Sequence, residues 1–163
     1  MTPNVRDAVA DDAESICRIY NLHVRNTIVT FEENDVPCHE MRARIAGVQS
    51  SLPWLVAERN GDVVGYAYAT KWHERAGYRY AVQSTIYVAE SAWRQGVGTA
   101  LYDALLERLS AGTIRTAIGV VALPNPASVA LHEKCGFRKV GHLDRVGIKF
   151  GRWVDVGLWQ IAW

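Results

Sequence analysis

The sequence predicts an α/β (α+β) protein built on a mixed, mostly antiparallel central sheet with helices on both faces. Short β-rich runs alternate with runs of helical period along the 163 residues. Some neighbouring β-rich runs are joined by tight turns and others by whole helices, so the sheet must contain both hairpin and crossover connections. No internal repeat, low-complexity tract or linker interrupts this pattern, and we expect a single domain over residues 1–163.

The first half of the chain predicts two helices and three strands. We expect a strand at residues 5–8, a helix ending near residue 25, a loop at 26–36, a helix at 37–49, and strands at 54–58 and 63–69. Asp11 or Asp12 is expected to cap the first helix, because a carboxylate there can accept a hydrogen bond from a first-turn N–H. The run Asn60, Gly61, Asp62 between the last two strands is typical of a hairpin turn.

The second half predicts two strand–helix units and a final pair of strands. We expect a loop at 70–79, a strand at 82–88, a loop at 89–98, a helix at 99–110, a strand at 116–121, a helix at 127–135, and strands at 137–143 and 153–161 joined by a loop at 144–152. Gly136 is placed to end the last helix, since glycine readily adopts the left-handed conformation that follows a helix. The segment at 70–79 is polar and aromatic without a period, which indicates a functional loop.

Composition and charge exclude several classes of protein. The net charge is +1, so we expect neither a nucleic acid nor a membrane surface as partner. No apolar run approaches the ~20 residues that a membrane span needs, and the N-terminal residues lack the pattern of a signal peptide. The three cysteines form no CxxC pair and suit a reducing compartment, so a cytoplasmic location is expected. The histidines show no metal-ligand spacing, and we expect no metal site.

The first motif with chemical meaning is WRQGVGT at residues 93–99, between a β-rich run and a helix. Glycines there let successive backbone N–H groups point one way, and the helix N-terminus behind them adds partial positive charge. The motif therefore predicts a pyrophosphate cradle, although glycines between a strand and a helix can also serve only as a turn. It is not a Walker loop, because no Lys–Ser/Thr pair follows, and it is not the dinucleotide-binding fingerprint.

The second motif is LPNPAS at residues 123–128 followed by LHEKCGF at 131–137. It predicts a helix capped at its start and ended by glycine. A cradle and helix, a buried strand, an Asn-opened helix and then Gly-Phe form the layout of the GNAT superfamily of acetyltransferases, which the chain resembles from end to end. The resemblance implies the GNAT fold.

Further segments are similar to one branch of that superfamily, the phosphinothricin and methionine sulfoximine N-acetyltransferases. The segments that carry this resemblance are PWLVAE at residues 53–58, Tyr78, the run 82–88, LHE at 131–133 and GRWVDVGLWQ at 151–160. The match covers essentially the whole chain. It implies acetyl-CoA as co-substrate, a small-molecule amine as acceptor and a homodimer, with the aromatic segment 153–163 as a candidate for interface and pocket wall or, alternatively, as core filling.

The resemblance also implies roles for individual residues. The residues implied for acetyl-CoA are Ile86, Tyr87 and Val88, whose backbone would hold the pantetheine, Arg94, Gln95, Gly96, Val97, Gly98 and Thr99 around the pyrophosphate, and Asn125 and Ser128. The residues implied for the acceptor are Arg75, Tyr78, Gln83, Ser84 and Thr85, and those implied for catalysis are Gln83 and His132. A guanidinium such as that of Arg75 suits a carboxylate or phosphinate, because its fork is bidentate and always charged.

Two positions depart from the pattern of the relatives. Trp93 opens the pyrophosphate motif where Gln or Arg is usual, and we expect acetyl-CoA binding to survive because the cradle is mainly backbone. Gln83 stands where the herbicide-detoxifying relatives carry a glutamate base, and an amide cannot accept a proton at neutral pH. A water chain, Glu74 or His73 could replace that base. His132 stands where many members carry a tyrosine thought to protonate the departing thiolate, unless it is only a helix-surface histidine.

The sequence thus predicts an N-acetyltransferase that moves the acetyl group of acetyl-CoA to the primary amine of a small acidic amino-acid analogue. Two alternatives stay open at this point. A GNAT enzyme for a peptide N-terminus or a polyamine is one, although a polyamine site should be lined by acidic residues and not by Arg75. A non-catalytic acyl-CoA-binding module is the other, and Gln83 is the best argument for it.

Overall fold

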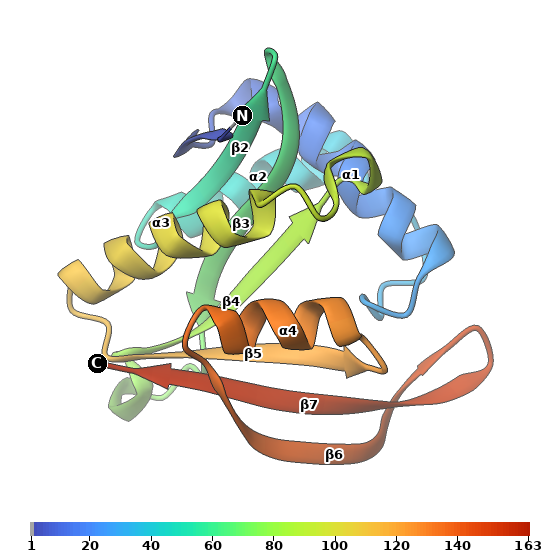
Figure 1. Cartoon of the computed structure of the whole chain (residues 1–163), viewed down its shortest axis with the longest axis vertical. Helices are drawn as coiled ribbons and strands as arrows, with labels where there is room; N and C mark the ends of the chain where they lie inside the picture. The colour runs from blue at the N-terminus through green and yellow to red at the C-terminus, as the bar shows by residue number, and fades with distance from the viewer. Residues whose placement is uncertain (1) are drawn as a thin grey trace.

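The computed structural model describes residues 2–163, which form a seven-stranded sheet in the order β1-β2-β3-β4-β5-β7-β6 (Figure 1). The strands are β1 (Asn4–Asp7), β2 (Trp54–Arg59), β3 (Asp62–Lys71), β4 (Ala81–Val88), β5 (Thr116–Leu123), β6 (Arg138–Lys149) and β7 (Arg152–Ala162). The helices are α1 (Ala13–Asn26), α2 (Cys38–Gln49), α3 (Val97–Ala111) and α4 (Pro126–Lys134). Only the β4–β5 pair is parallel among these strands. The predicted mixed, mostly antiparallel sheet is confirmed.

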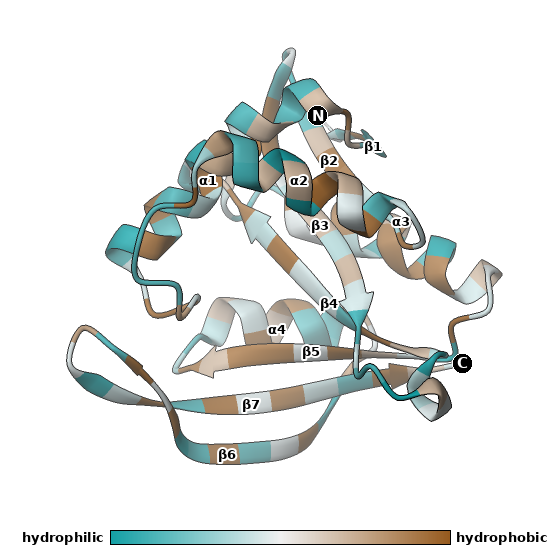
Figure 2. Ribbon diagram, turned by 180° about the vertical axis from the view of Figure 1, so that it is seen from behind, coloured by the Kyte–Doolittle hydropathy of each residue, from teal (hydrophilic) through white to brown (hydrophobic). Residues whose placement is uncertain are grey.

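The helices cover both faces of the sheet, as predicted. Figure 2 shows α1 and α2 lying over β2 and β3 on one face. Their apolar stripes pack with Trp54, Val56 and Tyr66 into one core cluster. On the opposite face, α3 packs its leucines against Leu55, Ala67 and other sheet residues in a second cluster. Both faces of the central strands are therefore buried, which fixes the register of each strand.

Two turns close the hairpins that flank the centre of the sheet. Asn60 and Gly61 have φ values of 52° and 85° between β2 and β3. Phe150 and Gly151 have φ values of 52° and 70° between β6 and β7. Two consecutive positive φ values are the geometry of the tight turn that matches the twist of a hairpin.

Several boundaries differ from the prediction, among them the end of β5, which extends to Leu123. Residues 144–152 are not a loop, because β6 runs through this segment to Lys149 and absorbs the extra residues at a bulge between Leu143 and Gly147. An exposed edge strand lacks the apolar alternation that would reveal it. Helix α3 begins at Val97 and not at residue 99, and strand β3 extends to Lys71, with a short 3-10 turn at Ala76–Tyr78 in the loop that follows.

The expected cap of the first helix is also wrong. Asp12 stands at the start of α1, but its carboxylate makes no capping bond to the helix. Its oxygens instead accept hydrogen bonds from the Val9 backbone N–H at 2.8 Å and from the Arg6 guanidinium at 2.7 Å. The guanidinium of Arg6 is the largest cause of the lowered pKa of Asp12. The charge–charge contact to the first strand thus takes precedence over capping.

None of the helices in the described part of the chain combines the length and apolar character needed to cross a membrane.

Candidate active site

The two central strands β4 and β5 diverge part-way along their length (Figure 1). Their parallel pairing runs from Ala81 opposite Thr116 to Ser84 opposite Gly119 and then stops. Beyond that point β4 continues to Val88, paired only with β3 among the described strands, while β5 continues to Leu123, paired with β7. The boundary between β4 and β5, called the seam below, therefore opens into a wedge beyond Ser84 and Gly119. The β4 edge of this wedge is free to pair with an extended, amide-bearing molecule.

The segment predicted to cradle the pyrophosphate, residues 93–99 (the cradle), lies after β4, at the start of α3. Arg94 and Gly96 have positive φ values of 58° and 79°, and α3 begins directly afterwards at Val97. A Cβ atom on Gly96 would meet nothing within 4 Å, whereas one on Gly98 would lie 3.0 Å from Leu131 of α4. Gly96 thus forms the turn and the open floor, and Gly98 allows close helix packing. The first-turn N–H groups of α3 have no partner within the helix and suit an anion.

Other side chains of the cradle motif have structural contacts. The Trp93 indole donates a hydrogen bond to the Val88 carbonyl at 3.0 Å and so ties the cradle to the end of β4. Gln95 donates to the Ser91 carbonyl at 2.8 Å and contacts the Arg59 guanidinium. Val97 is buried in the core, so only its backbone can contribute to the cradle. These three side chains are thus engaged in structural contacts, which leaves the backbone of the motif for a ligand.

Side chains alternate along β4 between the two faces of the sheet. Tyr87 packs with the cluster beneath α1 and α2, so Gln83 and Thr85 share that face by alternation. Tyr68 of β3 lies directly opposite Thr85 in the strand register. Ser84 points to the other face, where it is buried and lies 3.4 Å from the Tyr102 hydroxyl. The structure therefore brings Gln83 and Thr85 together and separates the Ser84 side chain from them.

His132 is buried within a hydrogen-bonded chain behind the seam. Its Nδ1 lies 2.7 Å from the Ser128 carbonyl, which can only accept, so Nδ1 carries the proton. Its Nε2 therefore accepts from the Tyr102 hydroxyl at 2.8 Å. Burial lowers the pKa of His132, with the Ser128 carbonyl opposing it, so the imidazole is neutral at pH 7. The alternative of a helix-surface histidine is wrong, because the side chain is only 3% exposed.

Comparison with known proteins bears directly on this arrangement. The family described as Acetyltransferase (GNAT) family matches residues 16–137. The chain belongs to the GNAT acetyltransferase family. It is therefore an acyltransferase.

Relatives of this GNAT chain resemble it over nearly its whole length. Phosphinothricin N-acetyltransferase of Alcaligenes faecalis is 46% identical over 158 residues, covering 96% of this chain and 79% of the relative. The L-methionine sulfoximine/L-methionine sulfone acetyltransferase of Pseudomonas aeruginosa is 34% identical, covering 99% of this chain and 95% of the relative. The crystal structure of a GNAT phosphinothricin acetyltransferase from Sinorhizobium meliloti in complex with AcCoA superposes with a TM-score of 0.96 at 38% identity, covering 99% of this chain and 89% of that one.

The loop that carries Arg75 and Tyr78 lies at the closed end of the GNAT seam. Trp72 N–H donates to the Ala81 carbonyl at 3.2 Å, which places the loop beside the first residue of β4. Tyr78 is 46% exposed, and its ring centroid lies 5.0 Å from that of His73. Glu74 is also exposed and lies 3.6 Å from the Lys71 ammonium. This loop therefore exposes polar and aromatic side chains beside the start of β4.

Asn125 and Ser128 belong to the start of α4. The Asn125 side-chain oxygen accepts a hydrogen bond from the Ser128 N–H at 3.1 Å and caps the helix. Ser128 supplies through its carbonyl the contact that fixes the His132 tautomer. Both residues therefore hold the geometry of the buried chain around His132.

Two residues of this site escape reasoning from the sequence. Tyr102 interrupts the apolar stripe of α3 with a hydroxyl, which was the available signal. Gly119 lies within a buried strand, and a Cβ there would be 2.4 Å from His132 Nε2. A glycine inside a strand often marks such a close approach.

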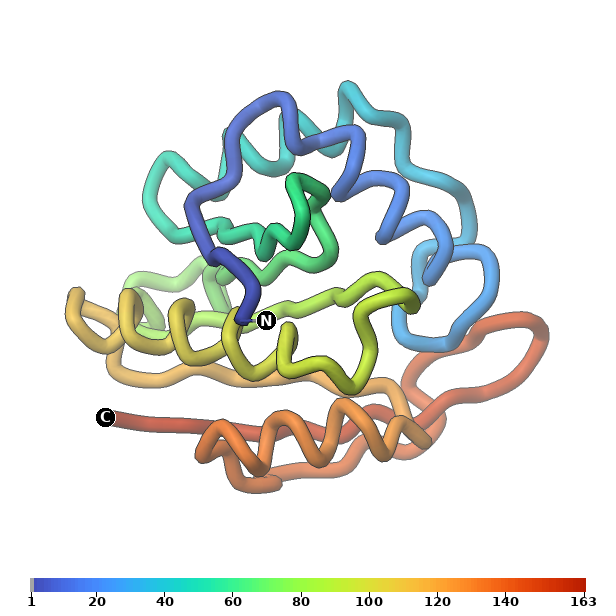
Figure 3. Tube along the Cα trace, turned by 45° about the horizontal axis from the view of Figure 1, so that its top comes forward, coloured from blue at the N-terminus to red at the C-terminus, as the bar shows by residue number. Residues whose placement is uncertain are grey.

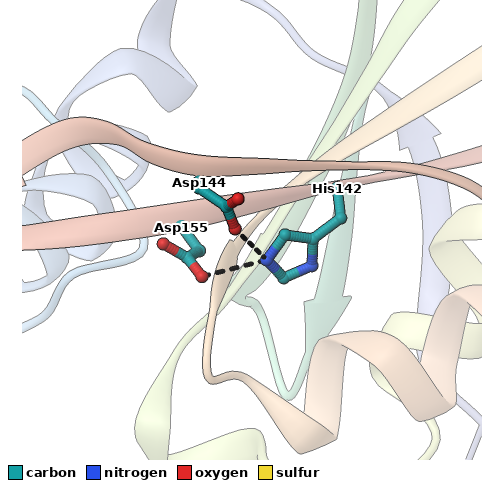
Figure 4. A group of neighbouring side chains, drawn as sticks. All are labelled: His142, Asp144 and Asp155. Carbon is teal, nitrogen blue, oxygen red and sulfur yellow. Dashed lines mark hydrogen bonds and ion pairs between the residues drawn. The ribbon is translucent and has the colours of Figure 1, made fainter.

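One group of three possible metal ligands comes together in residues 2–163 (Figure 4). His142 Nε2 lies 2.9 Å from Asp155 and 3.4 Å from Asp144 on the exposed β6–β7 hairpin. The other Asp155 oxygen accepts from the Arg145 N–H at 2.8 Å. That backbone bond is the largest cause of the lowered pKa of Asp155. The residues satisfy one another, and we interpret the group as the fastening of the β6 bulge.

Proposed function

We propose that this chain is an N-acetyltransferase that uses acetyl-CoA to acetylate the primary amine of a small acidic amino-acid analogue of the phosphinothricin or methionine sulfoximine kind. The observation that carries the proposal is the separation of β4 and β5 beyond Ser84 and Gly119, close in the chain to a helix N-terminus at which Gly96 has a positive φ and open space beside it. The names of the relatives supply the acceptor class.

The donor fits the residues around the wedge. The backbone of Ile86, Tyr87 and Val88 pairs with the pantetheine arm, and the N–H groups from Arg94 to Thr99 receive the pyrophosphate. Asn125 and Ser128 position the wall of α4 beside the thioester. When bound, acetyl-CoA supplies an activated acyl carbon and a thiolate leaving group.

The acceptor approaches from the face that carries Gln83 and Thr85. The Arg75 guanidinium and the Tyr78 hydroxyl bind the acidic group of the acceptor, because a planar cation matches a carboxylate or phosphinate. Gln83 orients the amine through its amide oxygen without taking its proton. The Ser84 side chain lies on the opposite face of β4 and takes part in proton transfer through its contact with the Tyr102 hydroxyl.

Proton transfer runs through the buried chain behind the seam. The amine nitrogen loses one proton as it bonds to the acyl carbon, and the departing sulfur gains one. The amine proton passes through water to the Ser84 oxygen while Ser84 passes its own proton to the Tyr102 oxygen and Tyr102 passes its own to His132 Nε2, so the imidazole transiently holds the extra proton. The same Nε2–H then returns its proton through Tyr102 toward the sulfur, so His132 ends in its initial state. In this role His132 replaces the glutamate that Gln83 has displaced.

The active form is a homodimer assembled through the β6–β7 hairpin, within one domain over residues 1–163. This hairpin carries a row of exposed apolar side chains, and β6 is an unpaired sheet edge in the described chain. The exposed row comprises Val140, Leu143, Val146, Ile148, Phe150 and Trp153. The enzyme works in the cytoplasm, which suits its three free cysteines.

A thiol-release assay with a panel of amines tests the function. We expect release with acidic amino-acid analogues and little with spermidine or a neutral peptide N-terminus. Arg75→Ala should raise KM for the acidic acceptor about 10- to 150-fold more than for a neutral amine, the scale of one lost charge-assisted hydrogen bond. Arg79→Ala is the control, because Arg79 shares the loop but stacks on Tyr80 at 4.5 Å.

Three results would redirect the proposal. Faster turnover of spermidine or a peptide would favour the other GNAT acceptors. Acetyl-CoA binding without thiol release from any amine would favour a binding module. Equal effects of Arg75→Ala on acidic and neutral amines would show that Arg75 does not read charge.

A further inference from the structure

Lys149, the last residue of β6, is a buried cation. Its side chain is only 2% exposed. The ammonium donates hydrogen bonds to the carbonyls of Thr30 and Glu32, both at 2.8 Å. Burial lowers the pKa of Lys149, and the nearby Glu33 and Glu32 oppose this. Burying a charged ammonium costs free energy, which its hydrogen bonds to the two backbone carbonyls offset. These bonds fix the position of both carbonyls.

The segment that Lys149 holds belongs to the loop between α1 and α2, and Figure 3 shows this loop beside the turn of the β6–β7 hairpin. Phe31 lies between the two bonded carbonyls. A Cβ on Gly147 would lie 2.4 Å from the Phe31 ring, so the ring packs directly on the hairpin backbone. The hairpin thus holds the loop from one side by charge and by ring packing.

The other side of the same segment faces the acceptor surface. The Thr30 hydroxyl lies 2.7 Å from the Tyr20 hydroxyl, and the Tyr20 ring packs on that of Tyr87 of β4 with the centroids 5.1 Å apart. Arg44 of α2 makes a bidentate pair with Glu32 at 2.9 and 2.7 Å. Residues 30–32 therefore lie over the face of the sheet that Gln83, Thr85 and Tyr87 share.

We propose that Lys149 is a positioning residue for the acceptor, holding residues 30–32 as a wall of the acceptor pocket so that the β6–β7 hairpin sets acceptor affinity. This inference rests on the proposed function, because it concerns the amine side of that site. Lys149 touches no reacting atom. It acts through the Thr30 and Glu32 carbonyls and through Phe31.

The test is Lys149→Met, which keeps the length of the stem and removes the ammonium. We expect KM for the acidic acceptor to rise about 10-fold or more as the wall loosens. The Kd for acetyl-CoA should stay within about twofold and kcat at saturating acceptor within about threefold, because the cradle and the His132 chain are untouched. Lys139→Met is the matched control, since it removes an exposed lysine from the same strand.

A second variant approaches the same wall without altering the charge. Gly147→Ala pushes a methyl group into the Phe31 ring, and it should reproduce the selective rise in acceptor KM. This variant decides the matter if Lys149→Met does not fold. An unchanged acceptor KM in a folded Lys149→Met or Gly147→Ala protein, or an equal rise for donor and acceptor, would overturn the inference.

Hydrogen exchange separates this inference from the proposed function. In Lys149→Met, the amides of residues 31–33 should exchange about 10-fold faster than in wild type while those of α3 are unchanged. A wild-type protein that acetylates no amine would refute the proposed function, yet hydrogen exchange would still test whether Lys149 holds residues 30–32. An active wild type with unchanged exchange in the variant would refute only this role of Lys149.

Discussion

In the proposed mechanism, Gln83 and His132 act from the two faces of one strand, and only His132 carries a proton. Gln83 supplies a neutral amide on the acceptor face. His132 supplies a neutral imidazole on the other, linked to β4 through Tyr102 and Ser84. The rate of the wild-type enzyme therefore depends on how well the buried chain substitutes for a direct carboxylate base.

Gln83→Glu should raise kcat/KM for phosphinothricin-like amines 10- to 10³-fold, about the contribution of a positioned general base. A carboxylate at this position accepts the amine proton directly and shortens the transfer path. Steady-state kinetics on an acidic amino-acid analogue would measure the gain. A Gln83→Glu protein that binds both ligands and is slower would show that the Gln83 amide has another essential partner.

The pH profile is the internal control for that comparison. The pKa of His132 lies below its ordinary 6.5 because the ring is buried. The imidazole is thus already neutral at pH 6.5, and its contribution falls only at lower pH. The wild-type rate should rise more steeply with pH than that of Gln83→Glu, because the amine must lose its proton with less help. The stability that buried His132 gives is complete above about pH 6.5 and declines as pH falls toward its lowered pKa.

Side-chain direction limited what could be predicted for single residues. Neighbouring residues of a strand point to opposite faces, so Gln83 and Thr85 belong together and Ser84 does not. The sequence shows these three residues only as neighbours and does not show that their side chains lie on opposite faces of the sheet. Lys149 was missed for a related reason: nothing in the sequence pairs a lysine with backbone carbonyls more than a hundred residues away.

The cradle depends on two glycines, Gly96 and Gly98, and replacing each by aspartate should have a different effect on the Tm of the protein. Gly96→Asp places a carboxylate against the phosphates at a φ of 79°, which side chains rarely adopt. It should abolish the rise in Tm that acetyl-CoA produces by binding the folded state. Gly98→Asp should do the same and also lower the Tm of the free protein, because its Cβ would press on Leu131.

Differential scanning fluorimetry with and without acetyl-CoA would measure both effects. Gly47→Asp on the exposed face of α2 is the control, since its Cβ would meet nothing within 4 Å. A full ligand-induced shift in both Gly96→Asp and Gly98→Asp would remove the cradle assignment.

Hydrophobic periodicity predicted the helices and the central strands, but not the point at which β4 and β5 separate. The apolar stripes of α1 and α3 and the Asn60–Gly61 turn each follow from local rules, and the structure contains them near the expected bounds. The point at which β4 and β5 part depends on register and twist, which no local pattern records. The first part of β6 was predicted, but its continuation through residues 144–149 was missed because most side chains of this strand are exposed and show no apolar alternation.

The assembled protein should be a dimer of 18.2 kDa chains at micromolar concentration. Sedimentation velocity would measure the mass. Replacing Trp153 or Ile148 by Asp should shift the protein toward one chain, because a charge in the exposed apolar row opposes burial. Val9→Asp is the control, since Val9 is an equally exposed apolar residue in another part of the molecule. A wild-type mass of one chain would contradict the dimer.

The seam between β4 and β5 also orders events during synthesis of the chain. β2, β3 and β4 pair in chain order through short connections, so a nascent chain can close them early. The meeting of Ser84 with Gly119 requires the crossover through α3, and His132 arrives later still. A ribosome that stalls after β4 would release a chain with a partial core and no means of catalysis, and acetyl transfer would begin only once the last third of the polypeptide has emerged.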